Sequence, residues 1–167
     1  MNPDFLGDSF DIVKRFFIEN IKSLGYQVFV DPMFTGEWTG LDRQFYKLVG
    51  AVPLGNFVKT GGRTALLLDP DTGIREKRSK GHITMDILVR HLQQHEIVFS
   101  FDQSFSRAGE PIVEIKRKLN TLQSLGAVGF YYDSHARFLF AAKSREALME
   151  IEQKLLDTGL PERRFIK

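Results

Sequence analysis

The sequence predicts an α/β fold: a three-layer Rossmann-like sandwich whose mostly parallel sheet has about five strands and ends in an antiparallel hairpin. Three observations predict it. Helix-like and strand-like segments alternate along the chain, the strand-like segments are nearly continuous apolar runs, and only a short turn separates the last two of them. Such alternation gives parallel strands joined by right-handed crossovers and buried on both faces. With 167 residues, the whole chain 1–167 is expected to form a single domain.

The first predicted elements are a helix, a strand and a second helix. Asp8 or Ser9 caps the first helix and Gly25 ends it. Its apolar residues follow the helical period: Val13, Phe16, Phe17, Ile21 and Leu24. The segment YQVFVD (26–31) is short, β-branched and aromatic, which is typical of a strand. After a loop, LDRQFYKLVG (41–50) is expected to form a short helix.

The middle of the chain supplies two further strands with a helix between them. The segment VPLGNFVKTGGR (52–63) is rich in glycine and is expected to be an irregular connection. TALLLD (64–69) then forms the second strand and EIVFSFD (96–102) the third. Thr84 caps the intervening helix, which is expected to run to about His95.

The last third of the chain supplies the hairpin and two helices. Proline is tolerated in a first helical turn, so Pro111 is expected to begin a helix. The predicted elements are a helix from Pro111 to Gly126, strands at 127–133 and 137–143, a helix from Ser144 to Gly159 and a loose tail at about 160–167.

Composition limits the classes of function. The chain is 43% hydrophobic and 26% charged, as an ordinary globular protein is. It has no cysteine, which excludes disulfides and zinc–thiolate sites. No apolar run approaches the roughly 18 residues of a membrane span, and no signal segment opens the chain, so we expect a cytoplasmic location without membrane contact. The net charge is only +2, so any nucleic-acid contact is expected to be local.

Aspartate ends four predicted strands in succession: Asp31, Asp69, Asp102 and Asp133. Asp71 follows two residues after Asp69. Ligands of open α/β sheets bind at the carboxyl ends of the strands, where these side chains are expected to gather. Their mutual repulsion would be relieved by a cation, and an all-oxygen ligand set favours Mg²⁺ or Mn²⁺. The sequence therefore predicts a metal site and catalytic centre at Asp31, Asp69, Asp71 and Asp102.

Basic residues close to these acids indicate an anionic substrate. The loop after the second strand carries Arg75, Lys77, Arg78 and Lys80, which would hold the backbone of a nucleic acid. His135 and Arg137, in the hairpin turn, are further candidates for phosphate binding. The resulting hypothesis is a divalent-metal-dependent phosphodiester hydrolase, similar to a nuclease. The alternative is structural, because aspartate at strand ends commonly caps turns and helices, and a basic run is commonly a solvated loop.

The segment LLLDPDTGI (66–74) resembles a strand-end motif of the form F-L-D-P-D-N-G-L, found in poorly characterised bacterial proteins. It is also distantly similar to the Asp/Asn-Pro-Pro-aromatic loop of class I S-adenosylmethionine-dependent methyltransferases. That resemblance implies that Asp69, Pro70 and Asp71 would grip the group to be modified. Asp71 and Thr72 replace the second proline and the aromatic residue, and the Gly-rich first strand has no counterpart.

S-Adenosylmethionine binding is therefore not expected. The resemblance leaves a second hypothesis: a methyltransferase-like fold without the cofactor half, which acts as a binding or interaction module. A methyltransferase proper is the third and least favoured interpretation.

Overall fold

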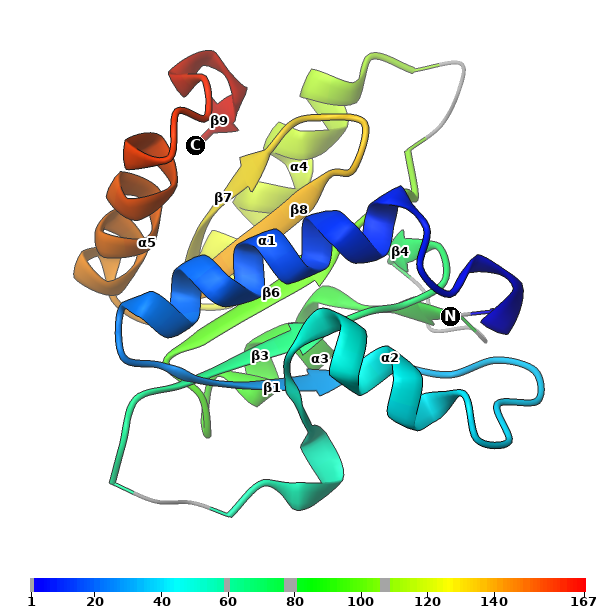
Figure 1. Cartoon of the computed structure of the whole chain (residues 1–167). Coiled ribbons are helices and arrows are strands. Elements are labelled where there is room, and N and C mark those ends of the chain that lie inside the picture. The colour runs from blue at the N-terminus through cyan, green and yellow to red at the C-terminus, as the bar shows by residue number, and fades with distance from the viewer. Residues whose placement is uncertain (1, 59–60, 77–80, 106–108) are drawn as a thin grey trace.

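The computed structural model describes residues 2–58, 61–76, 81–105 and 109–167, and it is an α/β structure around one central sheet (Figure 1). The sheet has seven strands in the order β2-β1-β3-β6-β8-β7-β9. These strands are β1 (Gln27–Asp31), β2 (Val52–Pro53), β3 (Thr64–Leu68), β6 (Ile97–Phe101), β7 (Val128–Tyr132), β8 (Phe138–Ala142) and β9 (Phe165–Ile166). A separate pair consists of β4 (Gly73–Ile74) and β5 (His82–Ile83).

The helices of the described residues alternate with these strands. They are α1 (Ser9–Ser23), α2 (Asp42–Val49), α3 (Met85–His91), α4 (Pro111–Ser124) and α5 (Arg145–Asp157), with short 3₁₀ turns η1 (Pro3–Phe5), η2 (Leu54–Asn56) and η3 (Glu162–Arg164). The Asp8 side chain caps α1, as predicted, and the hydroxyl of Ser144, where the last helix was predicted to begin, caps α5. No helix in the described part of the chain combines the length and apolarity that crossing a membrane requires.

Most strands of the sheet run in one direction. β2, β1, β3 and β6 pair in parallel, and β8 pairs antiparallel with both β6 and β7, so β7 also runs with β6. The predicted α/β class, mostly parallel sheet and closing hairpin are therefore confirmed. The prediction of about five strands was wrong, because β2 and β9 add a two-residue strand at each edge.

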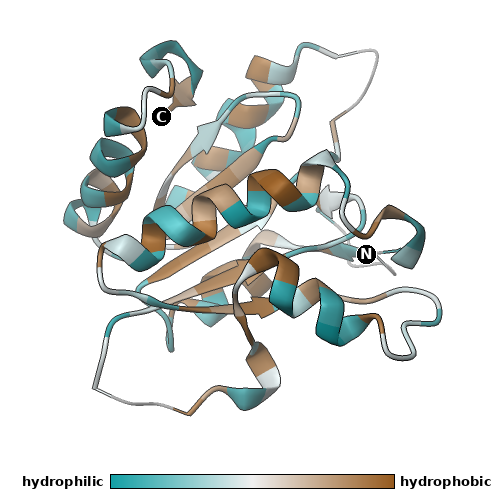
Figure 2. Ribbon diagram, viewed as in Figure 1, coloured by the Kyte–Doolittle hydropathy of each residue, from teal (hydrophilic) through white to brown (hydrophobic). Residues whose placement is uncertain are grey.

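Two apolar clusters lie against the sheet. Alternate sheet residues such as Leu67 and Phe99 pack in one cluster with α1, α2 and α5. The intervening residues, such as Leu66 and Val98, pack in the other with α3 and α4. Figure 2 shows the same arrangement as brown strands with mixed brown and teal helices around them. The strands are continuously apolar because both of their faces are covered.

α3 and the C-terminal segment also differ from their predicted structure. α3 ends at His91 rather than at about His95, and the chain turns so that the His95 ring packs beside Phe57, with 4.6 Å between ring centroids. The C-terminal segment, expected to be loose, instead forms η3 and β9, which pairs antiparallel with Tyr131 and Tyr132 of β7.

Candidate functional site at the carboxyl edge of the sheet

The four strand-end aspartates lie at the same edge of the sheet. β1, β3, β6 and β7 run in one direction, and Asp31, Asp69, Asp102 and Asp133 stand at their carboxyl ends. This topology places them at one common edge, as expected from the sequence. Their side chains nevertheless have separate partners.

Asp69 belongs to a buried ion cluster with α1. The Lys14 ammonium donates to Asp69 Oδ2 at 2.7 Å and to Asp11 Oδ1 at 2.9 Å. All three side chains are at most 4% exposed. Burial opposes the charge on Lys14, but the two carboxylates outweigh it and raise the pKa of the lysine. The ammonium also lies over the Phe101 ring, 5.5 Å from its centroid, so the cluster fastens α1 onto the sheet.

Asp102 belongs to a second buried network, on α4. The Lys118 ammonium and the Tyr131 hydroxyl donate to Asp102 Oδ2 at 2.6 and 2.8 Å. The Ser104 hydroxyl and the Ile74 backbone N–H approach Asp102 Oδ1 at 2.6 and 3.0 Å. Burial lowers the pKa of Lys118 although Asp102 opposes this, and burial raises the pKa of the Tyr131 phenol. One carboxylate therefore ties together α4, β7 and the loop after β3.

The two clusters lie on opposite faces of the sheet. Successive strand residues point to opposite faces, and Asp69 follows Leu68, which packs with α3 and α4. Asp69 therefore points to the α1 face, whereas Asp102, which follows Phe101 of the α1 cluster, points to the α4 face. Asp31 shares the face of Asp102, but β3 lies between their strands, a separation of about 10 Å. Asp31, Asp69 and Asp102 are thus not brought together.

Asp31 and Asp71 are partly exposed, as is Asp133 at the same edge. Asp31 Oδ1 accepts a hydrogen bond from the Met33 backbone N–H at 3.1 Å. Asp71 Oδ2 accepts one from the Thr35 hydroxyl at 2.6 Å. Burial disfavours the Asp71 carboxylate, but hydrogen bonds, including that of Thr35, outweigh burial and lower its pKa. The hydrogen bond between Thr35 and Asp71 joins the loop after β1 to the loop after β3.

The predicted substrate-binding residues lie along the same edge, so far as they are described. Arg75 is exposed, whereas Lys77, Arg78 and Lys80 fall outside the described residues. The Arg137 Nε donates to Asp133 Oδ1 at 2.6 Å, and its guanidinium lies over the Phe105 ring. The exposed His135 stacks on Phe10 with 5.4 Å between ring centroids. Arg75 and His135 therefore present polar groups to solvent.

Within residues 2–58, 61–76, 81–105 and 109–167, no group of three or more histidine, aspartate or glutamate side chains is arranged to hold a metal ion. The Mg²⁺ or Mn²⁺ site predicted at Asp31, Asp69, Asp71 and Asp102 stays a prediction. For Asp69 and Asp102, a metal would have to displace a buried ammonium. Asp31 and Asp71 accept hydrogen bonds from the Met33 backbone N–H and the Thr35 hydroxyl, respectively.

Lys14 and Lys118, the partners of Asp69 and Asp102, were not predicted from the sequence. Both occupy inward positions of their helices: Lys14 lies three residues before Phe17, and Lys118 lies between Ile115 and Leu122 on the buried stripe of α4. A lysine at a core-facing helix position is a signal that it has a buried acidic partner. This signal was available in the sequence.

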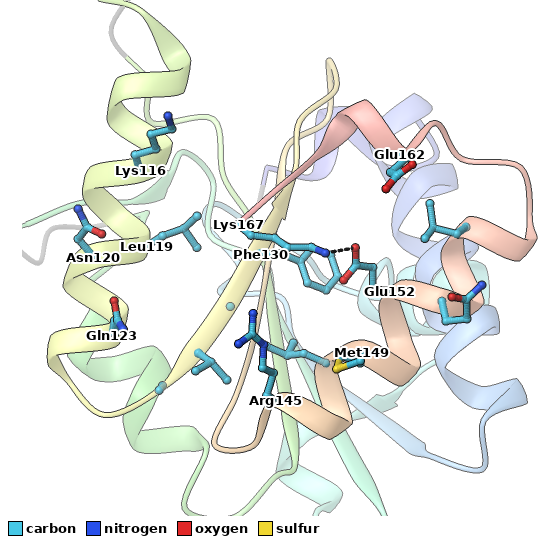
Figure 3. A pocket seen from close by; sticks show the side chains of 16 residues that line it. Lys116, Leu119, Asn120, Gln123, Phe130, Arg145, Met149, Glu152, Glu162 and Lys167 are labelled. Atoms are coloured by element: carbon cyan, nitrogen blue, oxygen red, sulfur yellow. Dashed lines mark ion pairs between the residues drawn. The ribbon is translucent and has the colours of Figure 1, made fainter.

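A groove of about 990 Å³ lies away from this edge, between α4 and α5 (Figure 3). Its floor is the first part of β7, including Val128, Gly129 and Phe130. Leu119 lines it from α4, and Met149 lines it from α5. At 58% exposure, Met149 is an apolar side chain that the described part of the chain leaves largely uncovered.

Comparison with protein-family models, with curated proteins and with solved structures finds no match to this chain.

Proposed function

We propose that the chain is an interaction module built on a three-layer Rossmann-like sandwich. In this proposal the carboxyl edge of the sheet is stabilised by buried ion pairs, and the groove between α4 and α5 contacts the partner. The two apolar clusters, in which helices pack on opposite faces of the sheet, support the three-layer description.

One observation supports the proposal above the others: Asp69 and Asp102, the most buried of the strand-end acids, are each paired with a lysine on opposite faces. Breaking such a pair leaves a buried charge and costs about 3–5 kcal/mol. A catalytic metal that displaced Lys14 or Lys118 would compensate the carboxylate, but it would leave a buried ammonium without that partner, which is itself costly. The acids of this edge thus act first as structural anchors for α1, α4 and the Asp-Pro-Asp loop.

Thermal unfolding with and without Mn²⁺, repeated with S-adenosylmethionine, tests this proposal. A ligand of the native state at 100 times its Kd adds about 2.7 kcal/mol, which raises the Tm by roughly 5–10 °C for a chain of this size. We expect neither ligand to raise the Tm. A rise with Mn²⁺ that is lost in Asp31→Asn would contradict the proposal and favour a metal site.

A metal-dependent phosphodiester hydrolase is the second candidate. The partial exposure of Asp31 and Asp71, with the exposed Arg75 in the same loop as Asp71, supports it. In that case Asp71→Asn should abolish Mg²⁺- or Mn²⁺-dependent cleavage of a nucleic acid while the variant keeps the native Tm. Cleavage that is unchanged in Asp71→Asn would remove Asp71 from the catalytic centre.

A further inference from the structure

We propose that the groove between α4 and α5 binds an extended peptide segment of a partner protein, which adds to the sheet as a strand beside β7. This inference rests on the proposed interaction function and specifies the partner of the same groove. The backbone edge of β7, the walls of the groove and its charges support it.

The first half of β7 has an open backbone edge. β8 pairs with all of β7, but on the other side β9 pairs only with Tyr131 and Tyr132. The Asp133 N–H donates to the Arg164 carbonyl on the β9 side, at 2.7 Å. Because backbone groups alternate in direction along a strand, the N–H and C=O of Gly129 also point to that side. No strand in the described part of the chain pairs with them there.

The walls of the groove suit the side chains of an added strand. Residues of such a strand would alternate between the two faces of the sheet. One set would contact Met149 and Leu156 of α5, and the other Leu119 of α4. These contacts are apolar, whereas the backbone edge supplies hydrogen bonds. In peptide recognition by strand addition, backbone hydrogen bonds provide affinity and side-chain contacts provide specificity.

The charges of the groove favour an acidic peptide. Lys167 and Glu152 neutralise each other in an ion pair of 2.7 Å (Figure 3). Lys116 on one wall and Arg145 on the other make no ion pair with any other described side chain. Glu162 adds one negative charge at the rim, so the unpaired groups leave a net positive charge. A peptide with alternating apolar residues and at least one carboxylate is therefore the partner that fits.

Random decapeptides displayed on phage, panned against the full chain, provide the probe. We expect the selected peptides to alternate apolar residues and to carry an acid. Their Kd, measured by fluorescence anisotropy on synthetic copies, should rise at least about tenfold for Arg145→Glu and for Met149→Asp. Arg15→Glu, which reverses an exposed charge on α1, is the matched control and should leave the Kd unchanged.

N-methylation of the peptide distinguishes strand addition from other modes of binding. An added strand directs every second N–H to β7, so methylation should weaken binding at alternate positions only. Binding that shows no such alternation, yet still depends on Arg145, would overturn strand addition and leave the interaction function standing.

Two further outcomes would also overturn the proposal. If no peptide is enriched relative to panning on Met149→Asp, both the strand addition and the proposed function of this groove fail. If sedimentation shows a dimer that Arg145→Glu dissociates, the occupant of the groove is a second copy of the chain, and the partner-peptide proposal falls.

Discussion

Gly73 is the residue that lets the loop after β3 reach Asp102. Its φ angle is +104°, which side chains rarely tolerate. A Cβ atom there would lie 2.2 Å from Asp102 Oδ1 and 2.8 Å from Asp102 Cα. The close approach lets the neighbouring Ile74 N–H donate to the same carboxylate. The glycine of the Asp-Pro-Asp-Thr-Gly segment therefore has a structural role that does not depend on any ligand.

Gly73→Ala should lower the free energy of unfolding by at least about 2 kcal/mol, because it combines backbone strain with a clash against Asp102. Urea denaturation measures the change. Gly55→Ala is the control, since a Cβ atom at Gly55 meets nothing within 4 Å. Equal stability of the two variants would show that the approach of Gly73 to Asp102 is not needed.

His95 makes the stability of the chain depend on pH. The residue is 2% exposed, its Nδ1 lies 3.2 Å from the Thr64 hydroxyl, and its Nε2 has no hydrogen-bond partner among the described residues. Burial, with a smaller effect of His91, lowers its pKa from 6.5 to about 4. The folded protein therefore resists protonation that the unfolded chain accepts.

Stability should fall as the pH drops from 6.5 to 4, by about 3 kcal/mol on account of His95. From about one pH unit above 6.5 the imidazole is almost entirely neutral in both states and contributes little pH dependence. Denaturation of wild type and His95→Leu at pH 7 and pH 4 isolates this residue from His82 and His91. Between pH 7 and pH 4 the wild type should lose more stability than His95→Leu. An equal loss would show that His95 does not cause this pH dependence.

Lys118 of the helix α4 makes a polar contact to the end of β6 within an otherwise apolar interface. Ile115 and Leu122 pack on the sheet, and Lys118 between them reaches Asp102 at the end of β6. Tyr131 of β7 joins the same carboxylate. This network fixes where α4 lies along the sheet, because the apolar contacts alone are not directional.

Lys118→Met should lower the free energy of unfolding by about 3 kcal/mol, the lower end for a broken buried pair, because Asp102 keeps its other hydrogen bonds. The matched control is Lys116→Met, an exposed position on the same helix, which should change stability by less than about 0.5 kcal/mol. Chemical denaturation compares the two. A smaller loss for Lys118→Met than for the control would show that the buried pair does not stabilise α4.

Most elements could be predicted from local pattern, and the exceptions have physical causes. Helix-like segments of the sequence located α1, α2, α4 and α5, and apolar runs located the five long strands. β2 and β9 could not be predicted, because a two-residue strand has no periodicity and exists only through its pairing with β1 or β7. α3 ends at His91, and the contact of His95 with Phe57, which local pattern does not predict, accompanies this early end.

At the scale of the whole molecule, the common edge of the aspartates could be predicted, but which lysine each aspartate would pair with could not. The common direction of the strands places their carboxyl ends at one edge of the sheet. The register between strands and the alternation of side chains determine to which face of the sheet each carboxylate points. Asp69 and Asp102 stand on neighbouring strands, yet an odd offset sends them to opposite helices. Lys14 is 55 residues from Asp69 in the sequence, so only the tertiary structure makes them neighbours.

A double-mutant cycle of Lys14 and Asp69 tests most directly whether the acids of this edge are structural anchors. The free energy of unfolding is measured for wild type, Lys14→Met, Asp69→Asn and the double variant. Lys14→Met should lower the free energy of unfolding more than Asp69→Asn does, since it removes the ammonium that pairs with both Asp69 and Asp11. We predict a coupling energy of at least about 2 kcal/mol between the two residues. A coupling energy below about 0.5 kcal/mol, with Asp69→Asn as stable as the wild type, would contradict the account.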